Sequence, residues 1–167
     1  MGNGLAADSG LTLRAITEAD RAFLLRLYKS TRELEMSLLP WPPEQIEVFL
    51  AQQFHAQQTH YSQQYPEAKF QIIEQNGSPV GRLTLDDRPT GLHIIEMALL
   101  PEYRNQGIGS TLIQAIFSEA QASGKTVSLS VKHDNPALSL YHRLGFKIIQ
   151  EHAPYSFMEW TPDESVA

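Results

Sequence analysis

The sequence predicts an α/β protein in which a mixed central β-sheet is flanked by helices. Strand-like and helix-like residue patterns follow one another along the chain without an internal repeat or a linker. Residues 92–100 (LHIIEMALL) are mostly apolar, which is typical of a strand buried on both faces. A polar loop with two glycines and the start of a helix follow this strand directly. We therefore expect the sheet to be organised around this strand–loop–helix unit.

The size and composition of the chain indicate one domain. Its 167 residues are 42% hydrophobic and 19% charged, which suits a single folded core. We expect that core to span residues 11–160, with tails at 1–10 and 161–167. No apolar run is long enough to cross a membrane, and the first ten residues lack the pattern of a secretory signal. These features predict a cytoplasmic protein without a membrane partner.

Charge and cysteine content exclude several classes of function. The formal net charge of −6 argues against the basic face that nucleic-acid binding requires. The chain has no cysteine, which excludes disulfides, thiolate metal sites and a cysteine nucleophile. We expect no metal site of another kind.

The N-terminal part of the chain predicts one strand followed by helices. Residues 11–16 (LTLRAI) alternate apolar and polar side chains, as in a half-buried strand. Thr17 then has the features of a helix N-cap, with acidic residues in the first turn. A separate second segment at 34–39 ends at a rigid proline-rich break. Pro43 can begin a further amphipathic helix that runs over about 44–65.

From residue 68 onward the pattern changes mainly to strands. Asn76-Gly77 predicts a tight turn between two of them, and Gly124 and Gly145 predict the ends of two helices. The expected strands are 70–74, 80–86, 92–100, 126–131, 146–150 and 155–160. One helix is expected to follow the glycine loop and end near residue 123, and another to span 135–144.

The glycine loop has the properties of a phosphate-binding loop. Arg104 begins an R-x-x-G-x-G run, and the absence of side chains at Gly107 and Gly109 lets backbone N–H groups approach a ligand. A helix that begins there adds unpaired N–H groups and the positive end of its dipole. The simpler alternative is a tight turn that requires glycine. No lysine follows Gly109 as a P-loop requires, and Leu112 stands where a dinucleotide-binding loop needs glycine or alanine.

Two motifs, in this order, resemble the GCN5-related N-acetyltransferase (GNAT) family. The sequence ALLPEYRNQGIGSTLI at 98–113 is similar to the acetyl-CoA motif of that family. The second motif consists of Asn135, Ala137, Leu140-Tyr141 and Leu144-Gly145-Phe146. The resemblance covers 11–160 and implies the GNAT fold, in which two central parallel strands splay apart.

The resemblance implies an N-acetyltransferase with acetyl-CoA as co-substrate. It would move the acetyl group to a primary amine of a small molecule or peptide by direct attack in a ternary complex. The pyrophosphate would lie on the glycine loop, and the pantetheine arm would pair with the strand before it. The expected cofactor-binding residues are Met97, Ala98, Leu99, Arg104, Asn105, Gln106, Gly107, Ile108, Gly109, Ser110, Asn135 and Tyr141. The alternatives are a CoA-binding sensor or inactive homologue without turnover, and an enzyme that moves a longer acyl group; a homodimer would be common for such a domain.

Acetyl transfer needs a base for the amine and an acid for the departing sulfur. By its position in the family motif, Tyr141 would be the acid; otherwise it only packs in the core. Glu96 and His93 are the candidate bases, although a chain of waters could replace both. Glu96 is a carboxylate within an apolar run, so it needs either a function or a partner such as Arg82. Glu96 and His93 are three positions apart, and a regular strand would turn them to opposite faces.

The acceptor amine is expected on the surface formed by residues 33–65, because the cofactor would use the loop and strands from Met97 onward. Leu39, Trp41 and Tyr61 are the expected substrate-binding residues, since aromatic faces attract a cationic amine. Alternatively, these side chains only pack the helices on the sheet.

Overall fold

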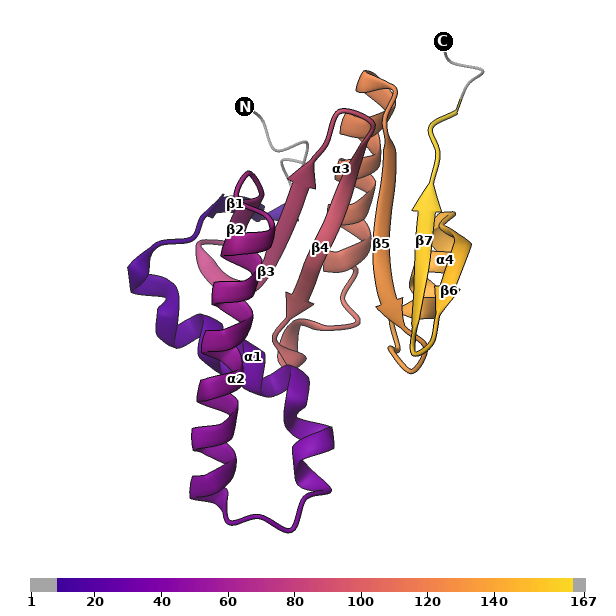
Figure 1. Cartoon of the computed structure of the whole chain (residues 1–167). Coiled ribbons are helices and arrows are strands. Elements are labelled where there is room, and N and C mark those ends of the chain that lie inside the picture. The colour runs from indigo at the N-terminus through magenta and orange to yellow at the C-terminus, as the bar shows by residue number, and fades with distance from the viewer. Residues whose placement is uncertain (1–8, 164–167) are drawn as a thin grey trace.

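The computed structural model describes residues 9–163, so most of the two predicted tails lies outside the described residues. A seven-stranded sheet in the order β1-β2-β3-β4-β5-β7-β6 forms the centre of the molecule (Figure 1). The strands are β1 (Leu11–Ala15), β2 (Lys69–Gln75), β3 (Ser78–Asp87), β4 (Gly91–Leu99), β5 (Thr126–Lys132), β6 (Lys147–His152) and β7 (Tyr155–Trp160). The helices are α1 (Arg21–Ser37), α2 (Pro43–Gln64), α3 (Ile108–Ser123) and α4 (Leu138–Leu144), with short 3-10 turns η2 (Glu18–Asp20) and η3 (Pro101–Tyr103).

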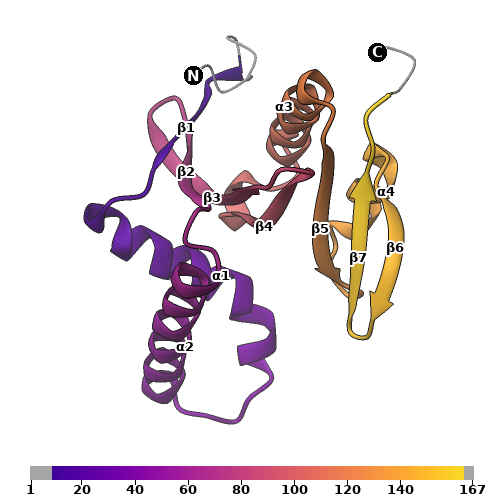
Figure 2. The same cartoon turned by 45° about the horizontal axis from the view of Figure 1, so that its top comes forward.

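The helices cover the two faces of the sheet separately, as the two views in Figures 1 and 2 show for α1 and α2 on one side and α3 on the other. Two adjacent residues of β2 demonstrate the alternation that creates the two faces. Ile72 is buried with Leu24 of α1 and Phe54 of α2. Ile73 belongs to the larger core, which α3 also lines through residues such as Leu112.

The sheet is mixed, as predicted, because one central pair of strands is parallel. All neighbouring strands pair antiparallel except β4 and β5. Parallel pairing runs only from Gly91 opposite Thr126 to Ile94 opposite Leu129. Beyond these pairs the two strands separate, and Figure 1 shows their arrows drawing apart toward the tips. The expected splayed pair of central parallel strands is therefore confirmed.

Two predicted helix boundaries are wrong. The segment at 34–39 is not separate, because α1 continues to Ser37 and buries Met36; no residue that breaks a helix occurs before Pro40. The last helix begins at Leu138 rather than at residue 135. Asn135 precedes it in a turn, where its side-chain oxygen accepts the N–H of Ala137 at 2.8 Å.

No helix within residues 9–163 is long and apolar enough to cross a membrane.

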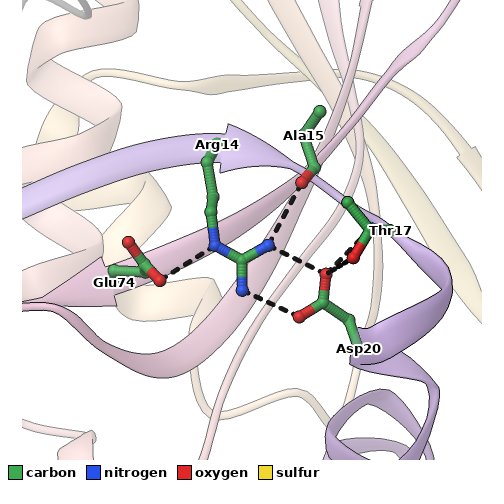
Figure 3. Close-up of polar contacts among 5 residues, drawn as sticks. All are labelled: Arg14, Ala15, Thr17, Asp20 and Glu74. Carbon is green, nitrogen blue, oxygen red and sulfur yellow. Dashed lines mark hydrogen bonds and ion pairs between the residues drawn. The ribbon is translucent and has the colours of Figure 1, made fainter.

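A partly buried ion-pair network joins β1 to the turn that begins α1 (Figure 3). The Arg14 guanidinium donates to both carboxylate oxygens of Asp20, at 2.8 and 2.7 Å, and its Nε donates to Glu74 of β2 at 2.9 Å. Asp20 also accepts the backbone N–H of Thr17 at 2.8 Å. These hydrogen bonds, that from Arg14 above all, hold the pKa of Asp20 far below its usual range. The network fixes the angle at which the chain leaves the sheet for the helices.

We predict that Asp20→Asn lowers the free energy of unfolding at pH 7 by about 2 kcal/mol, because Arg14 loses its paired charge. A carboxylate with a lowered pKa stabilises the fold above its unfolded pKa of about 4, and this contribution is lost as pH falls below that value. Urea unfolding between pH 7 and pH 2.5 should therefore show a steeper acid loss for the wild type than for Asp20→Asn. Glu102→Gln, which breaks the exposed pair with Arg26, is the control and should cost less than about 0.5 kcal/mol.

Candidate active site

A β-bulge at Ile95 marks the point where β4 leaves β5. On β3, Leu85 pairs with Ile94 and the preceding Thr84 pairs with Glu96, so Ile95 is an extra residue on β4. A bulge bends its strand and increases the local twist. The last pair between β4 and β5 joins Ile94 to Leu129, immediately before the extra residue. The bulge therefore explains why the central strands separate at this position.

The bulge also places Glu96 and His93 on the same face of the sheet, so the prediction of opposite faces is wrong. Residues that pair directly in an antiparallel ladder share a face. Glu96 pairs with Thr84 and His93 pairs with Asp86, and these partners are two residues apart on β3. The prediction assumed a regular strand, and one extra residue reverses the alternation from that point onward.

A cleft opens where the two strands diverge, with a volume of about 160 Å³. Glu96 and Tyr141 both line it, although they belong to different parts of the fold. Glu96 lies on the face of β4 that points toward α1 and α2, whereas Tyr141 lies on α4 and is buried in the core on the opposite face. The remaining lining residues are Ile94, Ile95, Met97, Leu129, Ser130, Val131 and Asn135. The cleft thus connects the two faces of the sheet.

Glu96 has Arg82 of β3 as its ionic partner, which was the alternative that the sequence had left open. Arg82 Nε lies 3.5 Å from Glu96 Oε1, and the side chains are 3% and 20% exposed. Burial raises the pKa of Glu96, whereas the positive charge of Arg82 acts in the opposite direction.

His93 lies where β4 and β5 are still paired, and it is not among the residues that line the cleft. Its Nδ1 is 2.8 Å from Ser128 Oγ, and its ring stacks on Phe157 with centroids 6.2 Å apart. Burial, with a smaller contribution from Arg88, lowers the pKa of His93 to about 4. The imidazole is therefore neutral at pH 7.

Tyr141 is held in the core while it lines the cleft. Its ring packs edge-on against Phe146 with centroids 5.7 Å apart, and the residue is 7% exposed. Burial raises the pKa of its hydroxyl, so the group keeps its proton at neutral pH.

The glycine loop forms the N-terminus of α3. Gly107 precedes the helix with φ +82°, and Asn105 is also left-handed with φ +60°, a conformation that favours glycine or asparagine. The first backbone bond of the helix runs from the N–H of Thr111 to the carbonyl of Gly107 at 3.0 Å. The N–H groups of residues 108–110 precede this bond, so they have no carbonyl partner within the helix. Arg104 Nε donates to the carbonyl of Leu99 at 3.0 Å and so ties the loop to β4.

The edge of β4 beyond the bulge presents backbone groups to the cleft. The carbonyl of Ala98 points toward β3, since a Cβ added at Gly81 would lie 2.2 Å from it. Backbone groups alternate in direction along a strand, so those of Met97 and Leu99 point toward the separated β5. Of the three strand residues predicted to bind cofactor, Met97 and Leu99 thus have backbone groups directed toward the separated β5, and Ala98 has its carbonyl directed away. Met97 also lines the cleft, whereas the carbonyl of Leu99 accepts the bond from Arg104.

The three predicted substrate-binding residues are not together. Trp41 lies just before α2, and its ring packs edge-on against that of Phe49 in the second turn of the helix. Leu39 is half-buried and follows α1. Tyr61 lies twenty residues beyond Trp41, which corresponds to about 30 Å along a helix. Burial first, and the charge of Glu96 second, raise the pKa of Tyr61 to about 12. Tyr61 is therefore the member of this set that lies near the cleft.

The predicted residue Met97 lines the cleft, but sequence reasoning missed four other apolar residues of its lining: Ile94, Ile95, Leu129 and Val131. Ile95 is one of several similar residues in IIEMALL, and no local pattern identifies which of them is the extra one. The strand pairing on both sides of β4 is needed to locate it.

The comparison with protein families agrees with the splayed sheet and the glycine loop at its centre. The sequence profile of the acetyltransferase (GNAT) family matches residues 22–146, which include β2 to α4. The chain belongs to the acetyltransferase (GNAT) family.

Two curated relatives resemble parts of this GNAT protein. An N-alpha-acetyltransferase of Sulfurisphaera tokodaii is 33% identical over 99 residues, which cover 50% of this chain and 59% of that protein. An N-alpha-acetyltransferase of Saccharolobus solfataricus is 34% identical over 61 residues, which cover 35% of this chain and 36% of that protein. The alignments therefore span less than two thirds of the length of either relative.

Solved structures share the fold over nearly the whole described chain. The PaiA N-acetyltransferase of Thermoplasma acidophilum, in complex with coenzyme A, has a TM-score of 0.68 at 20% identity and covers 90% of this chain and 98% of its own. The ribosomal-protein-S18-alanine N-acetyltransferase of Escherichia coli has a TM-score of 0.62 at 19% identity, and the match covers 90% of this chain and 93% of that protein. At these identities the likeness shows the fold.

Proposed function

We propose that this GNAT protein is an N-acetyltransferase that moves an acetyl group from acetyl-CoA to a primary amine in a ternary complex. The observation that carries this proposal is that Glu96 and Tyr141 line one cleft from opposite faces of the sheet. A carboxylate and a protonated phenol are the base and the acid that this reaction requires.

The residues of the chain fit acetyl-CoA. The unused N–H groups at the start of α3, with Gly107 left-handed before them, suit a pyrophosphate. The backbone groups of Met97 and the N–H of Leu99 suit the amide-containing pantetheine arm, which would pair with β4 as an added strand. The coenzyme A complex of a structural neighbour supports the same ligand class. Bound acetyl-CoA would supply the acetyl group as a thioester.

The residues around the cleft have complementary roles in this proposal. Glu96 takes the proton that the amine nitrogen loses as the nitrogen bonds to the acetyl carbon. The N–H of Leu99 points toward the separated β5 and stabilises the negative carbonyl oxygen that forms during attack. Tyr141 gives a proton to the sulfur as the carbon–sulfur bond breaks. The products are an amide and free CoA, and a proton then returns to Tyr141 as one leaves Glu96.

The neutral His93 is too far along the paired part of β4 to line the cleft, so Glu96 is the proposed base. Tyr61 is the proposed acceptor contact, because it faces Glu96 from the side opposite to Tyr141. The names of the two curated relatives favour the α-amino group of a peptide as acceptor, and a small-molecule amine is the alternative.

The first test is binding of CoA. A ligand that binds only the folded state raises the melting temperature, so CoA should stabilise the wild type. Gly107→Glu should remove this shift, because it places a carboxylate at the phosphate site and an unfavourable left-handed φ on a non-glycine residue. Differential scanning fluorimetry with CoA up to millimolar concentration gives the answer. Glu119→Gln, an exposed change within α3, is the control and should keep the shift; an unshifted wild type would contradict the proposed function.

The second test separates an enzyme from a CoA-binding sensor. Tyr141→Phe should lower kcat by roughly 10- to 1000-fold with little change in CoA affinity, because loss of a general acid affects the chemical step. CoA release can be measured over a panel of peptide N-termini and small amines. Equal turnover of the variant would leave Tyr141 as a packing residue, and no release with any amine would favour the sensor.

The third test concerns the acceptor. Tyr61→Ala should raise the KM for the amine about tenfold and leave the KM for acetyl-CoA unchanged, because Tyr61 lies near Glu96 and away from the glycine loop. Trp41→Ala is the matched control: its ring packs on Phe49, so it should lower the melting temperature without this selective change in KM. The reverse result would place the acceptor at the other end of α2.

A further inference from the structure

Arg82 is a buried cation whose hydrogen-bonding capacity is largely unused. Its side chain is 3% exposed, and neither Nε nor Nη2 has a hydrogen-bond partner among the described residues. Its ionic contact is with Glu96 at 3.5 Å, a separation at which charges attract strongly but no well-formed hydrogen bond is made. A charge buried without its full set of hydrogen bonds lowers stability, and such costs are typical of functional sites.

The strand register makes this contact possible. Arg82 pairs with Ala98 and Thr84 pairs with Glu96, so Arg82 and Glu96 are diagonal neighbours on one face. Without the bulge at Ile95, Glu96 would lie on the opposite face, away from Arg82. The feature that opens the cleft thus also brings the guanidinium to the carboxylate.

A second arginine pair in the same protein shows what a fully bonded contact does. Arg14 donates to both oxygens of Asp20, and the pKa of Asp20 is far below its usual range. Such a carboxylate is a poor proton acceptor. Glu96 differs, because its Oε1 makes no hydrogen bond and its pKa is raised by burial. Its lone pairs remain available.

The other titratable groups that face this region are neutral at pH 7. Tyr61 of α2, with a pKa of about 12, and Tyr141 of α4 keep their protons, and His93 on β4 itself has lost its second proton. Tyr65 of α2 and Tyr155 of β7 also act on Tyr61. Arg82 is therefore the charge that determines the ionisation of Glu96 among these groups.

We propose that Arg82 is a positioning residue that keeps Glu96 ionised and directed into the cleft while leaving its oxygens free to take the amine proton. The catalytic part of this inference rests on the proposed function. The electrostatic part concerns two side chains only and can be measured without turnover.

The test compares Arg82→Met with Arg82→Lys and Thr84→Val in the full chain. Methionine fills the buried site without a charge, lysine keeps the charge, and valine at 84 removes a neutral buried hydroxyl opposite Glu96 with little change in shape. Arg82→Gln replaces Arg82→Met if that variant does not fold, as judged by circular dichroism. The first readout is a ¹³C NMR titration of protein labelled at the glutamate carboxyl carbon, with the Glu96 signal assigned by its loss in Glu96→Gln.

We expect Arg82→Met to raise the pKa of Glu96 by about 1 to 3 units, because an adjacent cation lowers the pKa of a carboxyl by that amount. Arg82→Lys should change it less, and Thr84→Val should leave it unchanged. The acid limb of kcat/KM should move upward by the same amount in Arg82→Met, with activity recovering at high pH. A purely structural role would instead lower activity at every pH.

An unchanged Glu96 titration in folded Arg82→Met would overturn the proposal. A shifted titration with an unmoved acid limb would overturn the catalytic part, since Glu96 would then not be the base. If the wild type released no CoA with any amine, the proposed function would fail, and the NMR titration would still decide whether Arg82 controls the charge of Glu96.

Discussion

The separation of β4 from β5 at Ile95 is the constraint on which the rest of the site depends. Each strand keeps a partner on its other side, β3 for β4 and β7 for β5, so the sheet stays continuous while its centre opens. The backbone groups exposed along the opening lie next to the glycine loop that follows β4. A cleft with strand backbone groups along one wall and a helix N-terminus near its end suits the long, anionic ligand proposed above.

The same opening would let groups from both faces reach one substrate in the proposed reaction. An ordinary sheet separates its faces, and Glu96 and Tyr141 would then lie in different environments. Here each residue keeps the environment of its own face. Tyr141 is embedded among aromatic and aliphatic side chains that keep its hydroxyl protonated, and Glu96 has a cation beside it that opposes the effect of burial. The fold thus sets the two protonation states independently.

Most of the fold could be predicted from the sequence because the residues that begin and end helices and turns act locally. Pro43, Asn76-Gly77, Gly124 and Gly145 all mark boundaries that the structure confirms, and the RNQGIG loop begins a helix as expected. Apart from two helix boundaries, the predictions that were wrong depend on contacts between distant parts of the chain. The face of His93 relative to Glu96 follows from the pairing of β4 with β3, and the single extra residue responsible carries no signal of its own. The grouping of Trp41 with Tyr61 was wrong because nearness in sequence is not nearness along a long helix.

The buried polar atoms that folding leaves without partners are concentrated around this site. Within the described residues they belong to Arg82 and Thr84 of β3, Glu96 of β4, and Gln57 and Gln58 of α2, which precede Tyr61 by about one helical turn. Such groups normally find a partner in protein or water, and leaving them unpaired costs stability. By contrast, at the edge strand β1 all three guanidinium nitrogens of Arg14 have hydrogen-bond partners. The polar groups are therefore paired where the chain leaves the sheet for the helices, and several buried polar atoms are unpaired where the acceptor is proposed to bind. A polar acceptor that entered there would gain hydrogen bonds that the folded chain alone does not make, and these bonds would favour its binding at this place over others.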